Sequence, residues 1–216
     1  MDRELLDKII KAYDIRGLVD EEITPDFTFA LGIAFAKFIE REREPATVLV
    51  GEDMRPSSPD LATAFSDGIT SQGLDVIRIG LASTDQLYFA SGHLNLAGAM
   101  FTASHNPAEY NGIKLCKSGA KPIGQESGLL WIKDQISIGI RDGFAIPNRP
   151  PGKEIQRDLL AEYVDFLFSL FPAKTFTKEF TDRPIRIAID AGNGMGGHTA
   201  PAVMSRINAV VDGIYF

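Results

Sequence analysis

Cysteine and basic residues are scarce in this sequence, and each shortage excludes a class of protein. Cys116 is the one cysteine among 216 residues, so no disulfide can form within the chain, and we expect a cytosolic (cytoplasmic) protein. Lys and Arg number 22 against 29 Asp and Glu. The resulting net charge of −7 argues against a sequence-independent nucleic-acid binder, which needs a basic face. An anionic substrate would have to be held by a few focused cations.

Long apolar runs are missing as well. Residues 27–36 form the most apolar stretch, which is too short to span a bilayer. Residues 1–11 carry several charges and lack the apolar run of a secretory leader. We therefore expect no membrane partner. Hydrophobic residues still make up 44% of the chain and charged residues 24%, a composition that is typical of globular proteins and excludes disordered, collagen-like and coiled-coil chains.

Short apolar strands alternate with amphipathic helices along the chain, which predicts a layered α/β fold. Two helices are expected to begin at Thr24-Pro25 and at Ser58-Pro59, and Gly73 is placed to end the second. The other expected elements are strands over 47–51, 74–79, 96–101, 112–116, 185–189 and from 210, and helices over 87–90, 125–136, 155–171 and after 197.

A cluster of proline and glycine divides the chain. It falls within residues 142–153 and is typical of a linker. We predict a first domain over 1–141, this linker, and a second domain over 154–216. The last segment has only two expected strands, too few to close a sheet, so we predict that it is the truncated start of a domain.

The segment Thr102-Ala-Ser-His-Asn-Pro107 follows an expected buried strand and ends at a proline, which predicts a tight exposed loop. Ser104 would present its hydroxyl there, as a nucleophile or phosphate carrier must, and His105 and Asn106 can donate hydrogen bonds to a phosphoryl group. A plain surface turn is the alternative. A serine hydrolase is disfavoured because G-x-S-x-G is absent and adjacent Ser and His are not expected to form the Oγ–imidazole bond.

Two other motifs supply candidate cations. Lys11-Ala-Tyr-Asp-Ile-Arg-Gly17 contains the Tyr13 hydroxyl and Arg16, whose planar guanidinium suits a phosphate. Tyr110-Asn-Gly-Ile-Lys114 places Lys114 on the strand that leaves the serine loop. A cation there lowers the cost of a phosphoserine dianion, or takes part in proton transfer. The alternative is that both cations are ordinary surface residues.

A glycine-rich segment, Gly192–Gly197, lies between an expected strand and an expected helix, and Asp212 follows about twenty residues later. This pattern matches the dinucleotide fingerprint, so an NAD-dependent oxidoreductase is an alternative function. Asp190 argues against it, because its carboxylate would lie beside the pyrophosphate. The alternative interpretation is that the glycines only allow a tight turn between the strand and the helix.

Together the motifs resemble the α-D-phosphohexomutases, and within them the phosphomannomutase/phosphoglucomutase branch. The residues that carry the resemblance are Lys11-Ala-Tyr-Asp-Ile-Arg-Gly17, Gly51-x-Asp53-x-Arg55, Thr102-Ala-Ser-His-Asn-Pro107, Tyr110-Asn-Gly-Ile-Lys114 and Asp190-Ala-Gly-Asn-Gly194. Their order and approximate spacing match that family along nearly the whole chain. The resemblance implies a three-layer α/β/α domain I and the incomplete start of a similar domain II. Within the second motif, Asp53 and Arg55 either pair with each other or face the cleft, and we favour the structural pair.

The resemblance also implies a reaction, the reversible transfer of a phosphoryl group between carbons 1 and 6 of a hexose phosphate through a phosphoserine and a 1,6-bisphosphate. It assigns catalytic roles to Ser104, His105 and Lys114, and substrate-binding roles to Tyr13, Arg16 and Asn106. Mannose or glucose phosphates are the implied substrates. Mg²⁺ is the implied cofactor, bound to the phosphate on Ser104 and to ligands beyond Phe216. We therefore expect the chain by itself to be inactive; a non-enzymatic remnant is the alternative.

Overall fold

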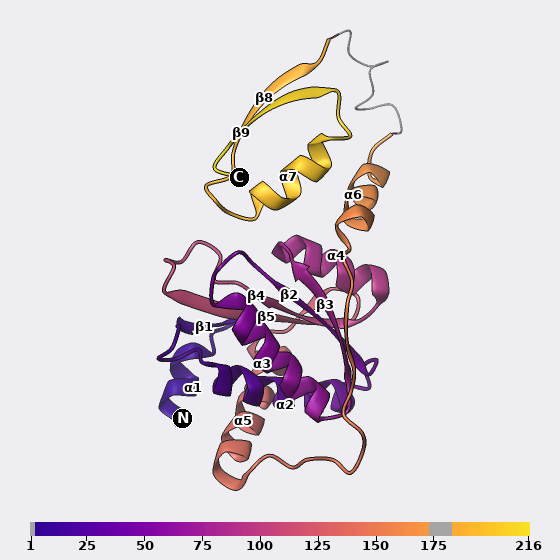
Figure 1. The fold of residues 1–216 in the computed structure, drawn as a ribbon. Helices are drawn as coiled ribbons and strands as arrows, with labels where there is room; N and C mark the ends of the chain where they lie inside the picture. The colour runs from indigo at the N-terminus through magenta and orange to yellow at the C-terminus, as the bar shows by residue number, and fades with distance from the viewer. Residues whose placement is uncertain (1–2, 173–182) are drawn as a thin grey trace. The chain divides into compact units, whose positions relative to one another are not determined.

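The computed structural model describes residues 3–172 and 183–216. The chain divides into two compact units, Met1–Arg157 and Asp158–Phe216, and each is described by itself (Figure 1). None of the helices within the described ranges is long and apolar enough to cross a membrane.

The first unit is built around one mixed sheet with the strand order β1-β5-β4-β2-β3-β7, in which β6 also pairs with β5. Its strands are β1 (Ile15–Leu18), β2 (Thr47–Glu52), β3 (Asp75–Leu81), β4 (Ala97–Phe101), β5 (Tyr110–Lys117), β6 (Lys121–Pro122) and β7 (Glu154–Gln156). β2 runs parallel to β3 and β4, whereas β5 runs antiparallel to β1 and β4. This pairing brings Arg16 on β1 opposite Gly112 on β5.

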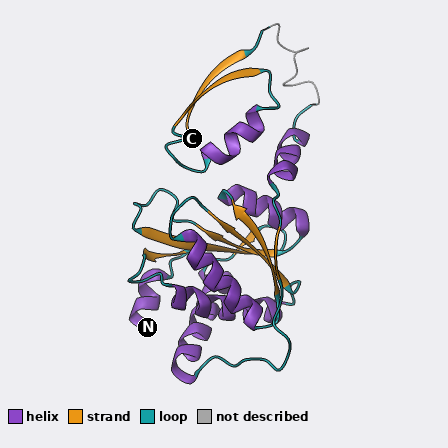
Figure 2. Cartoon of the chain, viewed as in Figure 1, coloured by secondary structure: helices purple, strands orange, loops and turns teal. Residues whose placement is uncertain are grey.

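Helices cover both faces of this sheet, which confirms the predicted α/β/α layers (Figures 1 and 2). They are α1 (Arg3–Ile9), α2 (Pro25–Glu42), α3 (Ser58–Ser71), α4 (Thr84–Leu94) and α5 (Leu130–Asp142), the last preceded by a π-helical turn over Gln125–Leu129. Alternate residues of β2 face opposite layers. Val48 and Val50 join the core formed with α2, α3 and α5, while Leu49 and Leu87 of α4 both lie beside Gly98.

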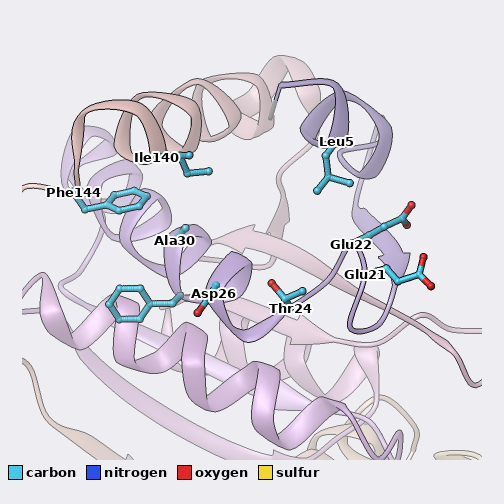
Figure 3. Close-up of a pocket in the computed structure, with 9 residues that line it drawn as sticks. Leu5, Glu21, Glu22, Thr24, Asp26, Ala30, Ile140 and Phe144 are labelled. Atoms are coloured by element: carbon cyan, nitrogen blue, oxygen red, sulfur yellow. The ribbon is translucent and has the colours of Figure 1, made fainter. Parts of the chain in front are cut away.

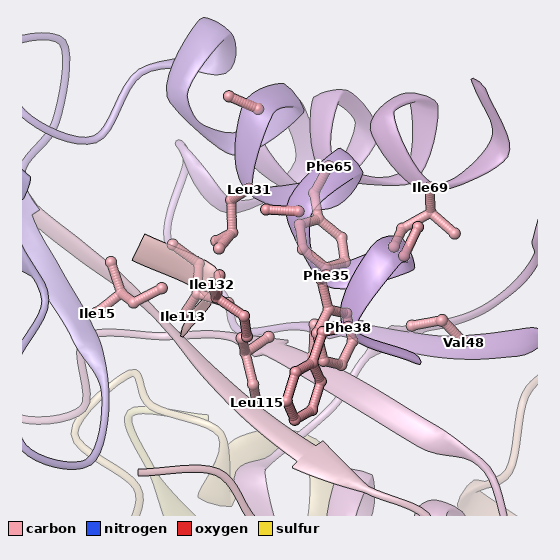
Figure 4. Packing of buried hydrophobic residues seen from close by; sticks show 14 of the residues in the cluster. Ile15, Leu31, Phe35, Phe38, Val48, Phe65, Ile69, Ile113, Leu115 and Ile132 are labelled. Atoms are coloured by element: carbon pink, nitrogen blue, oxygen red, sulfur yellow. The ribbon is translucent and has the colours of Figure 1, made fainter. Parts of the chain in front are cut away.

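Phenylalanine rings, among them Phe35, Phe38 and Phe65, contact one another within the hydrophobic core (Figure 4). The ring of Phe65 lies 5.9 Å from that of Phe35 and 5.5 Å from that of Phe101, which it meets edge-on at 70°. Aromatic rings bury large apolar areas and prefer such tilted contacts. These rings connect α2 and α3 to β4, the strand that leads into the serine loop, so the core fixes the point at which that loop begins.

Two helices begin where the sequence indicates. Thr24 has an extended backbone, and its Oγ1 accepts a hydrogen bond from the Phe27 N–H at 3.2 Å. α3 begins at Ser58 as expected, and Gly73, with φ 77°, follows its end. A side-chain cap therefore sets the start of α2, whereas Ser57 precedes α3 without a side-chain cap hydrogen bond and Pro59 lies in the first turn of that helix.

The helix predicted over 155–171 differs from the structure. Residues 154–156 form β7, which pairs with β3, and the helix α6 begins only at Leu160 (Leu160–Ser169). The Val76 N–H donates to the Lys153 carbonyl at 2.8 Å, and the Lys153 N–H donates to Asp75 Oδ1 at 2.8 Å. This pairing with a distant strand outweighs the local apolar periodicity, and it places 154–157 in the first unit rather than in the second.

The second unit contains α6, β8 (Ile185–Asp190), α7 (Gly196–Met204) and β9 (Ala209–Ile214). β8 and β9 pair in parallel, so the two strands expected near 185 and 210 are present. Residues 173–182 lie outside the described ranges. That this unit is the incomplete start of a domain remains a prediction.

Candidate functional site

The serine loop, residues 102–109, directly follows β4 and is as tight and exposed as predicted. Ser104 has φ 55°, a left-handed conformation that residues other than glycine seldom adopt. Its N–H donates to Thr102 Oγ1 at 3.0 Å, and the Asn106 N–H donates to the Ala103 carbonyl at 3.1 Å. The backbone therefore turns sharply at Ser104 and leaves its side chain on the surface.

Arg55 supports this loop from the protein side. Its guanidinium donates to four backbone carbonyls, those of Ser104 at 3.0 Å, Asn106 at 2.7 Å, Pro107 at 2.7 Å and Tyr110 at 2.9 Å. Its Nε lies 3.3 Å from Asp53 Oδ2, which confirms the predicted pair, although the angle makes no hydrogen bond there. The contacts of Arg55 with the serine loop were not among the expectations from the sequence.

Arg16 and Lys114 meet at one carboxylate, that of Asp14. Asp14 Oδ2 lies 2.6 Å from Arg16 Nη2 and 3.2 Å from Lys114 Nζ. Arg16 Nη1 also donates to Asn106 Oδ1 at 2.8 Å, which joins this cation cluster (Asp14, Arg16, Lys114) to the serine loop. Two cations share a single carboxylate, so one positive charge is in excess, and this favours an anionic ligand.

Asp14 was not among the predicted site residues, although it stands in the middle of the Lys11–Gly17 motif. Burial is the largest single influence on its pKa and acts to raise it. The hydrogen bonds and charges of Arg16 and Lys114 together outweigh burial, so the pKa of Asp14 falls below its ordinary value of 3.8. The ionised carboxylate therefore orients both cations.

Neither His105 nor Tyr13 is part of the cation cluster. His105 Nδ1 is 3.4 Å from Ser104 Oγ, a contact that was not expected of adjacent side chains and that the left-handed turn at Ser104 permits. Within the described ranges no carboxylate contacts His105, so a hydrolase triad is not assembled. Tyr13 is 82% exposed and lines a hollow of about 570 Å³ with Pro122 and residues 124–127.

The residues described here do not form a magnesium site by themselves. Within 3–172 and 183–216, no three His, Cys, Asp or Glu side chains gather as metal ligands. Mg²⁺ prefers several oxygen ligands in octahedral order. Asp14 already faces two cations, and Asp53 is occupied by Ser58 and Arg55. We therefore derive no step through a metal from this part of the chain.

A second hollow, of about 490 Å³, lies between α1, the start of α2 and the end of α5 (Figure 3). Apolar side chains such as Ile140 and Phe144 form one part of its lining. Glu21, Glu22 and Asp26 form another; Glu22 pairs with Lys8, and the carboxylates of Glu21 and Asp26 would repel a phosphate. The hollow shares no lining residue with the serine loop, so we do not assign a phosphorylated ligand to it.

The glycine-rich segment is arranged as a turn between β8 and α7. Gly192 and Asn193 both have φ 56°. The Gly192 N–H, which a pyrophosphate would need, donates instead to Asp190 Oδ1 at 2.9 Å. Asp212, the candidate ribose ligand, lies 3.3 Å from Arg186. This geometry favours the turn over the dinucleotide site.

Comparison with known proteins points the same way as the motifs. The chain is 36% identical over 202 residues to a phosphomannomutase of Escherichia coli, which covers 93% of this chain and 42% of that protein. It is 37% identical over 188 residues to a protein of Xanthomonas campestris named phosphohexose mutases, covering 87% of this chain and 39% of that one. The chain thus spans about two fifths of the length of these relatives.

Solved structures share the fold. A phosphoglucomutase/phosphomannomutase family protein of Burkholderia thailandensis matches with a TM-score of 0.81 at 26% identity, over 100% of this chain and 44% of that one. A protein described as a phosphomannomutase from Thermus thermophilus matches with a TM-score of 0.76 at 25% identity, over 94% of this chain and 45% of that one. Residues 7–137, which contain the serine loop and the cation cluster, match the family described as phosphoglucomutase/phosphomannomutase, alpha/beta/alpha domain I. The chain therefore belongs to the phosphoglucomutase/phosphomannomutase family.

Proposed function

We propose that this chain forms the phosphoserine-bearing part of a cytoplasmic phosphohexomutase, an isomerase of carbohydrate metabolism. Its substrates would be the 1- and 6-phosphates of mannose or glucose, with a 1,6-bisphosphate as intermediate. One observation carries the proposal. An exposed serine in a left-handed turn is joined through Asn106 to a cluster of Asp14, Arg16 and Lys114 that holds one excess positive charge.

The proposed chemistry follows from these positions. The bond between Ser104 Oγ and phosphorus breaks as a sugar hydroxyl forms a new bond to that phosphorus. The hydroxyl loses its proton, and Oγ, as the leaving group, gains one. His105 Nδ1, 3.4 Å from Oγ, is placed to exchange that proton. Arg16 and Lys114 would attract the phosphoryl oxygens, because such transfers depend mainly on positioning and charge neutralisation.

The roles that the resemblance implies for Tyr13 and for Mg²⁺ depend on more than the serine loop and the cation cluster. Tyr13 would contact substrate only if the sugar extends over the hollow beside residues 122–127. Mg²⁺ would need carboxylates in addition to the phosphate on Ser104. We therefore expect residues 1–216 to show no mutase turnover when assayed alone.

A hybrid protein tests this proposal. It consists of residues 1–216 followed by the remainder of the Escherichia coli phosphomannomutase. We expect the hybrid to convert mannose 1-phosphate to mannose 6-phosphate in a coupled assay, and expect no conversion by residues 1–216 alone. The substitution Ser104→Ala should abolish turnover and leave sugar-phosphate binding largely intact, since it removes the carrier and not the binding groups. Undiminished turnover by Ser104→Ala would refute the proposal.

A further inference from the structure

We propose that Arg55 is a positioning residue for Ser104, because its guanidinium holds the serine loop in the shape that exposes the nucleophile. The inference rests on the proposed role of Ser104 as phosphate carrier. Left-handed backbone at a residue other than glycine is unfavourable and persists only where the surroundings hold it. At Ser104, which has φ 55°, the guanidinium holds the carbonyl while Thr102 Oγ1 accepts from the N–H.

Each terminal nitrogen of Arg55 donates to two backbone carbonyls. Nη2 bridges the carbonyls of Ser104 and Asn106, and Nη1 bridges those of Pro107 and Tyr110. Carbonyls from both ends of the turn therefore bind to the same planar guanidinium. A trans peptide directs its C=O and N–H in opposite directions, so the His105 N–H faces away from Arg55. A phosphoryl oxygen that lies on that side of the loop can accept a hydrogen bond from this N–H.

Arg55 is itself held in place. Asp53 Oδ1 accepts hydrogen bonds from the Arg55 N–H at 3.1 Å and from Ser58 Oγ at 2.7 Å. Asn111 Nδ2, on β5, donates to Ser58 Oγ at 3.0 Å. Asp53, whose Oδ2 lies 3.3 Å from Arg55 Nε, is therefore held beside the guanidinium by contacts from α3 and β5. A lysine in place of Arg55 keeps the charge but cannot reach four carbonyls with one nitrogen.

Arg78 offers a matched control. It lies on β3 of the same sheet, its side chain is 8% exposed against 6% for Arg55, and its Nε is also buried without a hydrogen-bond partner. It pairs with Glu52 and donates to Thr63 Oγ1, and makes no contact with the serine loop. Arg78→Lys therefore shows how far the replacement of any buried arginine in this unit changes amide exchange and the rate of Ser104 phosphorylation.

The test compares Arg55→Lys with Arg78→Lys by amide hydrogen exchange in the 216-residue chain. We expect the amides of residues 102–111 to exchange about tenfold faster or more in Arg55→Lys and to be unchanged in Arg78→Lys, since only the first loosens the loop. In the hybrid, phosphorylation of Ser104 by glucose 1,6-bisphosphate should slow by about tenfold to a hundredfold for Arg55→Lys alone, the effect of a displaced reacting group.

Three outcomes decide whether Arg55 positions the serine loop. Faster exchange confined to the loop in Arg55→Lys supports the positioning role. Equal loop exchange in the two variants, or a normal rate of Ser104 phosphorylation in Arg55→Lys, overturns it. If the unsubstituted hybrid takes no phosphate on Ser104, the proposed function fails, and the exchange comparison still decides whether Arg55 holds the loop.

Discussion

At the scale of single residues, one carboxylate organises the charged part of the site. The motifs predicted Arg16, Lys114 and Ser104 as candidates, because their side chains have the chemistry that a phosphate needs. The same motifs did not indicate that Asp14 joins the two cations, because the contact spans 100 positions along the chain. Residue type can be read from sequence, but a shared partner depends on the pairing of β1 with β5.

The lowered pKa of Asp14 predicts a pH-dependent contribution to stability. A folded-state pKa below the unfolded value of 3.8 means that the contribution is complete above that value and is lost as the pH falls through the lowered pKa. Unfolding free energies of the unsubstituted chain and of Asp14→Asn, measured from about pH 7 to about pH 2, should therefore differ at neutral pH and converge in acid. A difference independent of pH would contradict the assignment.

Lys114 should matter to catalysis far more than its neighbour on the same strand. In the hybrid, Lys114→Ala should lower turnover by about two to four powers of ten, the usual cost of losing an acid/base or charge-stabilising group. Lys117→Ala is the control, because Lys117 is also on β5, is 25% exposed against 28%, and pairs with Glu42 away from the serine loop. Similar rates for the two variants would contradict a phosphate site at Lys114.

Arg16→Lys should also be harmful in the hybrid. One terminal nitrogen of Arg16 donates to Asn106 and the other to Asp14, and a single ammonium cannot reproduce both contacts in that geometry. We expect a clear loss of turnover with little change in the thermal midpoint. Turnover close to that of the unsubstituted hybrid would show that the planar guanidinium is not needed.

At the scale of elements, the close crossing of α2 and α3 depends on glycine. A Cβ on Gly68 would lie 2.3 Å from the Phe29 carbonyl oxygen, and one on Gly32 would lie 2.2 Å from the Phe65 carbonyl oxygen. The starts of both helices could be predicted, because the signals at Thr24-Pro25 and Ser58-Pro59 are local. The crossing involves two helices, so neither glycine could be assigned this packing role from sequence. For the same reason β7 was predicted as helix, since its partner β3 is distant in the chain.

Gly68→Ala should therefore destabilise the first unit. Overpacking of a rigid contact costs about 1–3 kcal/mol, and here the obstacle is backbone. Gly92→Ala is the matched control, because Gly92 lies inside α4 and its added Cβ would approach only Ala120, at 4.0 Å. That change should be neutral or stabilising by up to about 1 kcal/mol. Chemical denaturation of both variants measures the difference, and equal effects would contradict the close crossing.

At the scale of the whole molecule, the first unit ends after β7. The cluster of proline and glycine predicted the linker, but several contacts attach residues of this same segment to the first unit. Arg149 Nε donates to the Gln72 carbonyl at 2.6 Å, and the Gly152 N–H donates to the Thr70 carbonyl at 2.9 Å. Composition indicates where a chain lacks helix and strand, and it does not indicate which surface the segment follows.

Two truncations should therefore differ in stability. Residues 1–157 keep β7 and the contacts of Arg149, whereas residues 1–141 lose them and expose the edge of β3. We expect the shorter chain to unfold at a midpoint lower by about 5 °C or more. Equal midpoints in thermal scans would show that residues 142–157 do not stabilise the first unit.

The most direct test of the account is the position of the transferred phosphate. The hybrid is incubated with glucose 1,6-bisphosphate, digested, and its peptides are mapped by mass spectrometry. The account predicts one phosphate, on Ser104, and none in Ser104→Ala. Phosphate on Ser57, Ser58 or Ser118 in place of Ser104, or on no serine at all, would contradict the claim that Ser104 is the phosphate carrier.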